Sequence, residues 1–190
     1  MTLNIRAACL NERKADFDKE KKMVTFYFVT YGKKNEYGEI FLKGSLTNAM
    51  LNKNISEIKH FKNHCLKNPP GVVRSISEDD YGAFATCELL KTEAGEETYE
   101  EYLAEQITQH SFGFMYRDGG FNYNKETDAI IITNYELKEV SSLNSWGADP
   151  NTKTINLNGQ EFDRTEFINS IKNGESKQIN IDNILNSIKL

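Results

Sequence analysis

The sequence predicts a mainly β protein with inserted helices (α+β), in which about seven short strands form a small closed or nearly closed barrel. Three observations lead to this prediction. Short segments rich in β-branched and aromatic residues recur along the chain, separated by turns rich in glycine, asparagine and aspartate. Only two of the stretches between them have helical spacing. After Pro150 the composition changes, which predicts a helical C-terminal extension outside the barrel.

The strands are predicted from β-branched and aromatic residues and from alternation with period two. The segment 24–31 (VTFYFVTY) has the strongest strand character. The turn 78–82 predicts a hairpin between strands 72–76 and 83–90. A short apolar run at 40–42 lies in a loop punctuated by glycines. The remaining predicted strands are 58–61, 109–117, 121–124, 129–133 and 135–141.

Two helices are predicted before Pro150. Ser45 is a residue type that can cap a short helix running to Leu51. The longer helix begins after Thr92, a second capping residue, and has Tyr99 and Tyr102 at helical spacing on one face. Glutamates cover the rest of this helix, as expected for a solvated face; a surface that docks a partner is the alternative.

The composition divides the chain into three parts. A charged N-terminal segment, 1–22, leads into the barrel domain, 23–150. The extension, 151–190, carries two short helical patterns at 163–173 and 182–190. We expect this extension to be dispensable for the barrel and to serve docking, oligomer contact or removal by self-cleavage, because exposed polar stretches are preferred sites of proteolytic nicking.

Charge and cysteine content limit the possible functions. The 190 residues carry a net charge of −5, whereas a general nucleic-acid binder normally has a basic face. The three cysteines are scattered without a CxxC pair, which favours a reduced, intracellular setting. No apolar run approaches the length of about 18 residues that suggests a membrane helix. We therefore expect a cytoplasmic protein with neither nucleic-acid nor membrane partners.

Three separated residues supply the parts of a serine acyl-transfer site. In the strand 109–117, Ser111 and Gly113 alternate with large residues and are expected to point away from the core. A serine hydroxyl needs a base to accept its proton, and that base needs an orienting group. His64, after a predicted strand, is the candidate base, and Glu139 is the candidate orienting carboxylate.

Less specific interpretations compete with this one. Taken singly, Ser111, His64 and Glu139 are also ordinary strand or surface residues. His110 neighbours Ser111 and would point to the opposite face of the strand, so it is poorly placed as the base. For the oxyanion, the candidates are backbone N–H groups near Gly113 or the positive charge of Arg74 or Arg117.

His60 and His64 are candidate metal ligands, because they are four residues apart with Cys65 alongside. On a helix, residues at this spacing share one face and could both bind zinc. The glutamate of an HExxH motif is missing, however, and no third ligand lies in an obvious motif. We therefore expect no metal and no cofactor, although a metal-binding hydrolase is kept as an alternative.

The order of several short motifs resembles the prohead (procapsid maturation) serine proteases of tailed bacteriophages, which are similar in fold to the herpesvirus capsid-maturation protease. The resemblance covers 24–150. Its motifs are GEIFLKGSL at 38–46, FKNH at 61–64, GVV at 71–73, EDDYGAF at 78–84, SFGF at 111–114, ELKEVS at 136–141 and ADP at 148–150. By position within these motifs, the resemblance implies a catalytic histidine at His64 and a nucleophile at Ser111.

The resemblance also implies a biological role. Such an enzyme would cleave the phage scaffolding protein, the major capsid protein precursor and itself inside the immature procapsid, in the cytoplasm of the bacterial host. A homo-oligomer is expected. The alternative from another functional class is an inactive barrel that serves as a scaffold or assembly factor. The simultaneous presence of His64 and Ser111 favours the protease, because a scaffold needs neither.

Overall fold

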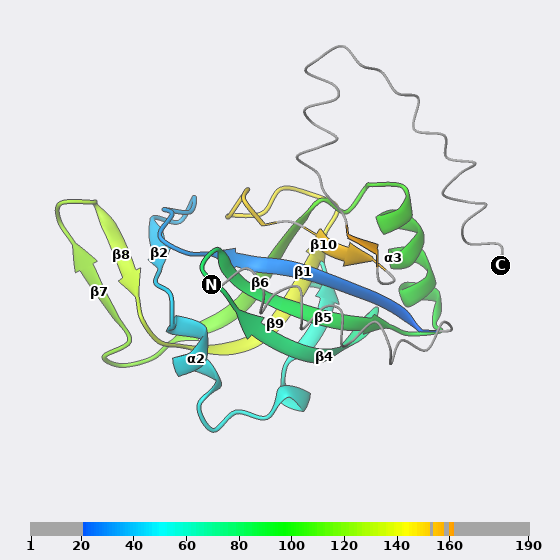
Figure 1. The fold of residues 1–190 in the computed structure, drawn as a ribbon, viewed down its shortest axis with the longest axis horizontal. Helices are drawn as coiled ribbons and strands as arrows, with labels where there is room; N and C mark the ends of the chain where they lie inside the picture. The colour runs from blue at the N-terminus through cyan, green and yellow to red at the C-terminus, as the bar shows by residue number, and fades with distance from the viewer. Residues whose placement is uncertain (1–20, 153, 158–159, 162–190) are drawn as a thin grey trace, which may run out of the picture.

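The structure is a computed structural model and describes residues 21–152, 154–157 and 160–161 (Figure 1). Eleven strands, two α-helices and one 3-10 helix lie within these residues. The strands are β1 Lys22–Thr30, β2 Glu39–Phe41, β3 Lys59–Lys62, β4 Gly71–Glu78, β5 Gly82–Leu89, β6 Gln109–Tyr116, β7 Phe121–Asn124, β8 Ala129–Ile132, β9 Tyr135–Leu143, β10 Thr154–Leu157 and β11 Gln160–Glu161. The helices are α2 Ser45–Met50, η1 Ile55–Glu57 and α3 Glu93–Leu103.

Eight strands form the main sheet, in the order β11-β10-β1-β5-β4-β3-β9-β6. The hairpin predicted around 78–82 is confirmed as β4 and β5, with a register shift between Val73 and Ser75. The mainly β fold with few helices is also confirmed. Closure of the barrel is not: within the described residues the sheet is open, with β11 and β6 at its two ends.

The sheet curls so that β6, the strand at one end of its order, packs against β1 (Figure 1). The rings of Phe26 on β1 and His110 on β6 stack with their centroids 4.2 Å apart. Farther along the same two strands, the rings of Phe28 and Phe112 are 5.4 Å apart. Aromatic packing therefore holds the two strands together where a closed barrel would have ladder hydrogen bonds. The enclosed side chains form the core.

β9 lies between β3, to which it is parallel, and β6, to which it is antiparallel. Ser141 on β9 is opposite Phe61 on one side and Ser111 on the other. Two residues earlier, Glu139 is opposite Gly113. Since residues directly opposite in neighbouring strands share a face, Ser111, Gly113 and Glu139 all lie on one face of the sheet.

The remaining elements are a second, smaller sheet and the helices. A second sheet has the strand order β2-β8-β7. Its strand β2 includes Ile40 and Phe41 of the apolar run 40–42, which the sequence predicted as part of a loop. Helix α3 begins as predicted, with the Thr92 side chain accepting a hydrogen bond from the Gly95 N–H. The prediction that Ser45 caps α2 is wrong: Gly44 is the capping residue, at a φ of 89° that favours glycine, and Ser45 is the first helical residue.

Strand β10 continues the main sheet beyond Pro150. It pairs antiparallel with β1, on the side opposite β5, and the Thr152 and Thr154 side chains are buried. The sheet thus extends into the range predicted as a separate extension. The N-terminal residues 1–20 and both predicted C-terminal helices, at 163–173 and 182–190, lie outside the described residues. Within the described part of the chain, no helix is long and apolar enough to cross a membrane.

Candidate active site

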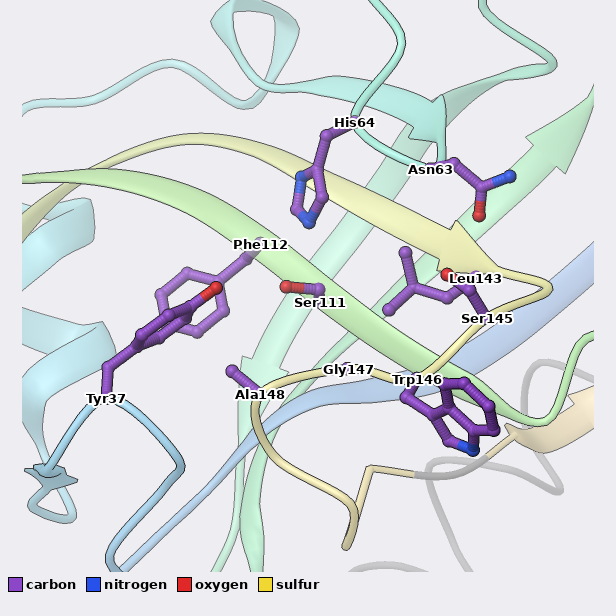
Figure 2. A pocket seen from close by; sticks show the side chains of 10 residues that line it. All are labelled: Tyr37, Asn63, His64, Ser111, Phe112, Leu143, Ser145, Trp146, Gly147 and Ala148. Atoms are coloured by element: carbon purple, nitrogen blue, oxygen red, sulfur yellow. The ribbon is translucent and has the colours of Figure 1, made fainter.

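A cavity of about 280 Å³ opens on the face of the sheet that carries Ser111 (Figure 2). The loop after β9 forms one wall and the turn after β3 forms another. Its lining residues are Tyr37, Asn63, His64, Ser111, Phe112, Leu143, Ser145, Trp146, Gly147 and Ala148. Two of the three residues singled out in the sequence, His64 and Ser111, are therefore brought to one cavity although they are far apart in the chain.

Strand alternation presents Ser111 to this cavity. Its neighbour His110 is fully buried on the other face, against Phe26 and Tyr102. Phe112 packs with the core aromatics Phe28 and Phe41. Figure 2 shows the His64 ring above the Ser111 side chain, on the same side of the cavity. The period-two pattern thus correctly put Ser111 and His110 on opposite faces of β6, although Tyr116, one of the alternating large residues, is 45% exposed.

His64 lies in a tight turn that follows β3. Both central residues of this turn, Asn63 and His64, have positive φ, 52° and 56°. The Cys65 N–H donates to the Lys62 carbonyl at 3.0 Å, which closes the turn. Positive φ at both central residues is the feature of type I′ turns, where asparagine is tolerated better than most residues. This backbone lifts the His64 side chain over β9.

The Glu139 carboxylate orients the His64 ring through a hydrogen bond at Nδ1. One carboxylate oxygen lies 2.7 Å from His64 Nδ1, and the other accepts a hydrogen bond of 2.6 Å from the Ser141 hydroxyl. Glu139 is only 7% exposed. A carboxylate acceptor at Nδ1 favours the tautomer with the proton there, which leaves Nε2 with a lone pair. The hydrogen bond that Glu139 accepts raises the pKa of His64, whereas partial burial of the ring acts to lower it.

Gly113 makes room for this carboxylate. A Cβ atom at Gly113 would lie 2.6 Å from the nearer Glu139 oxygen and 3.0 Å from Glu139 Cγ, closer than real Cβ contacts allow. The SxG spacing therefore has a steric reason that sequence analysis missed. The serine occupies one position of the strand face, and two residues later a glycine leaves space for the group that orients the histidine.

We expect Gly113→Ala to reduce turnover strongly without unfolding the protein. The added methyl group would push the Glu139 carboxylate away from His64, and such misplacement costs on the order of 100-fold in rate. Steady-state kinetics together with a thermal melt would measure this. Gly119→Ala, in a turn after β6 at a φ of 72°, strains the backbone away from the site and is therefore a control for a loss of stability alone. Wild-type turnover in Gly113→Ala would contradict the steric argument.

None of the three residues suggested for the oxyanion is among the described residues that line the cavity. The guanidinium of Arg74, on β4, binds Glu88 on the neighbouring β5, with Nε 2.7 Å from the carboxylate. Arg117 follows the end of β6. Gly113 lies beneath Glu139. Both arginines thus lie outside the lining of the cavity, and the role of backbone N–H groups near Gly113 stays a prediction.

The other two histidines are in the core. His60 Nε2 lies 2.8 Å from the Ser142 hydroxyl, and His110 Nε2 lies 3.0 Å from the Tyr102 hydroxyl. Burial lowers the pKa of His60 to about 3 and the pKa of His110 well below its ordinary value, so both rings are neutral near pH 7. His60 and His64 have different partners on opposite faces. Among the described residues, no three histidine, cysteine, aspartate or glutamate side chains are grouped to hold a metal ion.

Several residues of the site were missed in the sequence. The Ser141 hydroxyl supports Glu139, and its position two residues along the same strand was an available signal. Tyr37 and Trp146 flank the cavity with 77% and 91% exposure. Tyr37 reaches the cavity from the loop before β2, where it directly precedes the motif at 38–46, but nothing in that motif indicated that the tyrosine side chain would line the site.

One family model covers most of the chain. A family model described as "Caudovirus prohead serine protease" matches residues 9–166. No curated protein matches the chain significantly. Among solved structures, the capsid assembly protease of bacteriophage T4 is similar, with a TM-score of 0.43, 10% identity, and coverage of 66% of this chain and 81% of that one.

Two herpesvirus enzymes are also similar. For a KSHV protease bound to a hexapeptide phosphonate inhibitor, the TM-score is 0.42 at 10% identity, with coverage of 64% of this chain and 59% of that one. For varicella-zoster virus protease, the TM-score is 0.36 at 16% identity, with coverage of 62% and 58%.

Proposed function

Given that this chain belongs to the caudovirus prohead serine protease family, we propose that Ser111, His64 and Glu139 are its catalytic triad. One observation carries the assignment. The 2.7 Å contact between His64 Nδ1 and Glu139 orients a histidine whose ring shares a cavity with the Ser111 hydroxyl. A nucleophile, its base and the group that orients the base are the parts that serine acyl transfer requires.

The chemistry follows from these positions. His64 Nε2 accepts the Ser111 proton as Oγ attacks the carbonyl carbon of the scissile peptide. The resulting imidazolium is stabilised by the Glu139 carboxylate and then protonates the leaving amine, so that an acyl-enzyme remains on Ser111. Water, deprotonated by the same ring, hydrolyses that ester and restores the serine. Each proton that leaves a nucleophile returns to a leaving group through His64.

We further propose that the substrates are the scaffolding protein and the major capsid protein precursor of the same phage, and this chain itself. Family membership supports action on capsid precursors inside the procapsid, within the host cell. The enzyme would act there as a homo-oligomer. Self-cleavage would fall in the segment after the last described strand, as the polar stretch 174–178 suggests.

The test is incubation of the purified protein with the scaffolding and major capsid proteins encoded beside it, followed by mass spectrometry of the products. Cleavage by the wild type, and none by Ser111→Ala, is the expected result. A wild-type protein that reacts with a fluorophosphonate at Ser111 but cuts neither protein would remove these substrates and keep the protease. Cleavage by both proteins would remove the triad.

Replacement of Glu139 by glutamine should shift the pH dependence of turnover. The base works only when His64 is neutral, and Glu139 raises the pKa of His64, so wild-type activity should rise with pH through a midpoint above the ordinary 6.5. Glutamine keeps a hydrogen-bonding group but loses the charge, so the midpoint should fall.

The rate should fall as well, by up to about 10⁴-fold, because the orienting carboxylate is the least costly member of a triad to remove. A pH profile of kcat/KM measures both effects. Glu136→Gln is the control, because Glu136 is a partly exposed carboxylate on β9 that binds Lys138 and Lys53 and does not contact His64. An unchanged midpoint in Glu139→Gln would show that Glu139 does not act on the base.

A further inference from the structure

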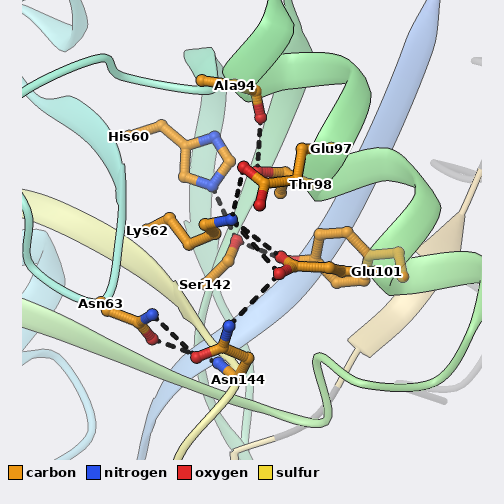
Figure 3. Close-up of polar contacts among 10 residues, drawn as sticks. His60, Lys62, Asn63, Ala94, Glu97, Thr98, Glu101, Ser142 and Asn144 are labelled. Carbon is orange, nitrogen blue, oxygen red and sulfur yellow. Dashed lines mark hydrogen bonds and ion pairs between the residues drawn. The ribbon is translucent and has the colours of Figure 1, made fainter.

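Two asparagines join the walls of the cavity through their side chains (Figure 3). Asn63 Nδ2 donates to Asn144 Oδ1 at 2.8 Å, and the Asn144 backbone N–H donates to Asn63 Oδ1 at 3.2 Å. In addition, the Asn63 backbone N–H donates to the Ser142 carbonyl at 2.9 Å. Asn63 thus donates two hydrogen bonds and accepts one, and these three bonds connect the turn that carries His64 with the end of β9 and the loop that follows it.

Helix α3 contacts the Asn63–Asn144 pair through Glu101. The Glu101 carboxylate accepts a hydrogen bond from Asn144 Nδ2 at 3.2 Å, and the ammonium of Lys62 lies 3.1 Å from the same carboxylate. Lys62 also forms an ion pair with Glu97, one turn earlier on α3, at 3.0 Å. The Glu101 and Lys62 side chains are only 12% and 20% exposed. The glutamate-rich helix face therefore carries a specific contact to the site.

We propose that Asn63, Asn144 and Glu101 form a positioning network that sets the distance between the histidine turn and the loop after β9. This inference rests on the proposed triad. Asn63 directly precedes His64, while Asn144 lies between Leu143 and Ser145, which line the opposite wall. None of the three network residues is required to touch the reacting bond. Their effect passes through the residues beside them.

The backbone of the turn explains why such a network is needed. Asn63 and His64 are both held at positive φ, a conformation that costs free energy in residues other than glycine and persists only when surrounding contacts enforce it. The His64 side chain is 46% exposed, and among the described residues Glu139 is its one hydrogen-bonding partner. Without the asparagine pair, the turn would lose its side-chain hydrogen bonds to the loop after β9.

The test compares three single variants and one double variant. Asn144→Ala removes the side-chain bonds to Asn63 and Glu101 and keeps only the bond from its backbone N–H to Asn63 Oδ1. Asn63→Gly removes the side chain but tolerates the positive φ, so backbone strain does not confuse the result. Asn48→Ala, which removes an exposed amide bonded to the Thr133 carbonyl on the other side of the molecule, is the matched control.

Two measurements separate positioning from stability. The first is the rate at which diisopropyl fluorophosphate modifies Ser111 as a function of pH, since this rate needs the base but no peptide substrate. We expect roughly 10- to 100-fold slower modification in Asn144→Ala and Asn63→Gly. We also expect a lower pH midpoint, because the His64–Glu139 contact loosens. The second is a thermal melt, which should show the variants folded at the assay temperature.

The double variant should be within about 2-fold of the slower single variant, since both changes break the same connection. Rates within about 2-fold of the wild type in both singles, an unshifted midpoint, or fully additive losses would each overturn the network. Ser111→Ala distinguishes this failure from a failure of the triad. If Ser111→Ala is not modified while the asparagine variants behave as wild type, the triad stands and the network falls.

Discussion

Ser111→Ala is expected to abolish proteolysis while leaving the fold intact. The change removes only a hydroxyl from a side chain that faces the cavity rather than the core. In a well-studied serine protease, loss of the nucleophile costs about 10⁶-fold in kcat, and a weaker enzyme has less to lose. Cleavage of the capsid and scaffolding proteins, with a thermal melt to establish folding, measures this effect.

A second serine supplies the matched control. Ser145 lines the same cavity from the loop after β9. Ser145→Ala should retain turnover, because the side chain of Ser111, and not that of Ser145, lies beneath the His64 ring (Figure 2). Should Ser145→Ala be inactive and Ser111→Ala active, the nucleophile would be Ser145 and the proposed triad would be wrong.

His64→Ala should be nearly as inactive as Ser111→Ala. Without an acceptor for the serine proton, the hydroxyl is a weak nucleophile, and in the same reference enzyme removal of the base costs about as much as removal of the nucleophile. Because the His64 side chain is about half exposed, its removal should change the free energy of unfolding little. Activity near neutral pH, with the melting temperature as a second readout, tests this.

His110→Ala provides the contrast. This ring is fully buried, stacks on Phe26 and pairs with the Tyr102 hydroxyl, so its loss should lower the melting temperature by creating a cavity and an unpaired polar group. The expected pattern is a stable, inactive His64 variant and a destabilised His110 variant whose folded fraction is active. The reverse pattern would assign the base to His110.

The sequence predicted most strands because each depends on local composition. The hairpin β4–β5, strand β6 and the cap at Thr92 could all be read from neighbouring residues. Topology could not. The parallel pairing of β3 with β9 and the pairing of β1 with β10 join residues far apart in sequence, and no local signal specifies them. The same limit explains why the sequence predicted a closed or nearly closed barrel without showing where the sheet stays open.

At the site, residue types were predictable and contacts were not. Alternation along β6 indicated that Ser111 faces away from His110, and the motif order suggested His64 and Glu139. The positive φ of Asn63 and His64 depends on tertiary contacts to Asn144 and could not be read locally. Arg74 was suggested from its charge alone, whereas the structure pairs it with Glu88.

The pairing of β10 with β1 restricts where this chain can be cut and survive. A break before Thr154 would release β10 and leave the backbone groups of β1 unpaired along one side. A long, apolar strand exposed in this way recruits strands from other molecules. A chain shortened near Thr152 should therefore aggregate, whereas one shortened after Glu161 keeps every described strand. Inside a crowded shell, that difference would separate a soluble mature enzyme from a precipitate.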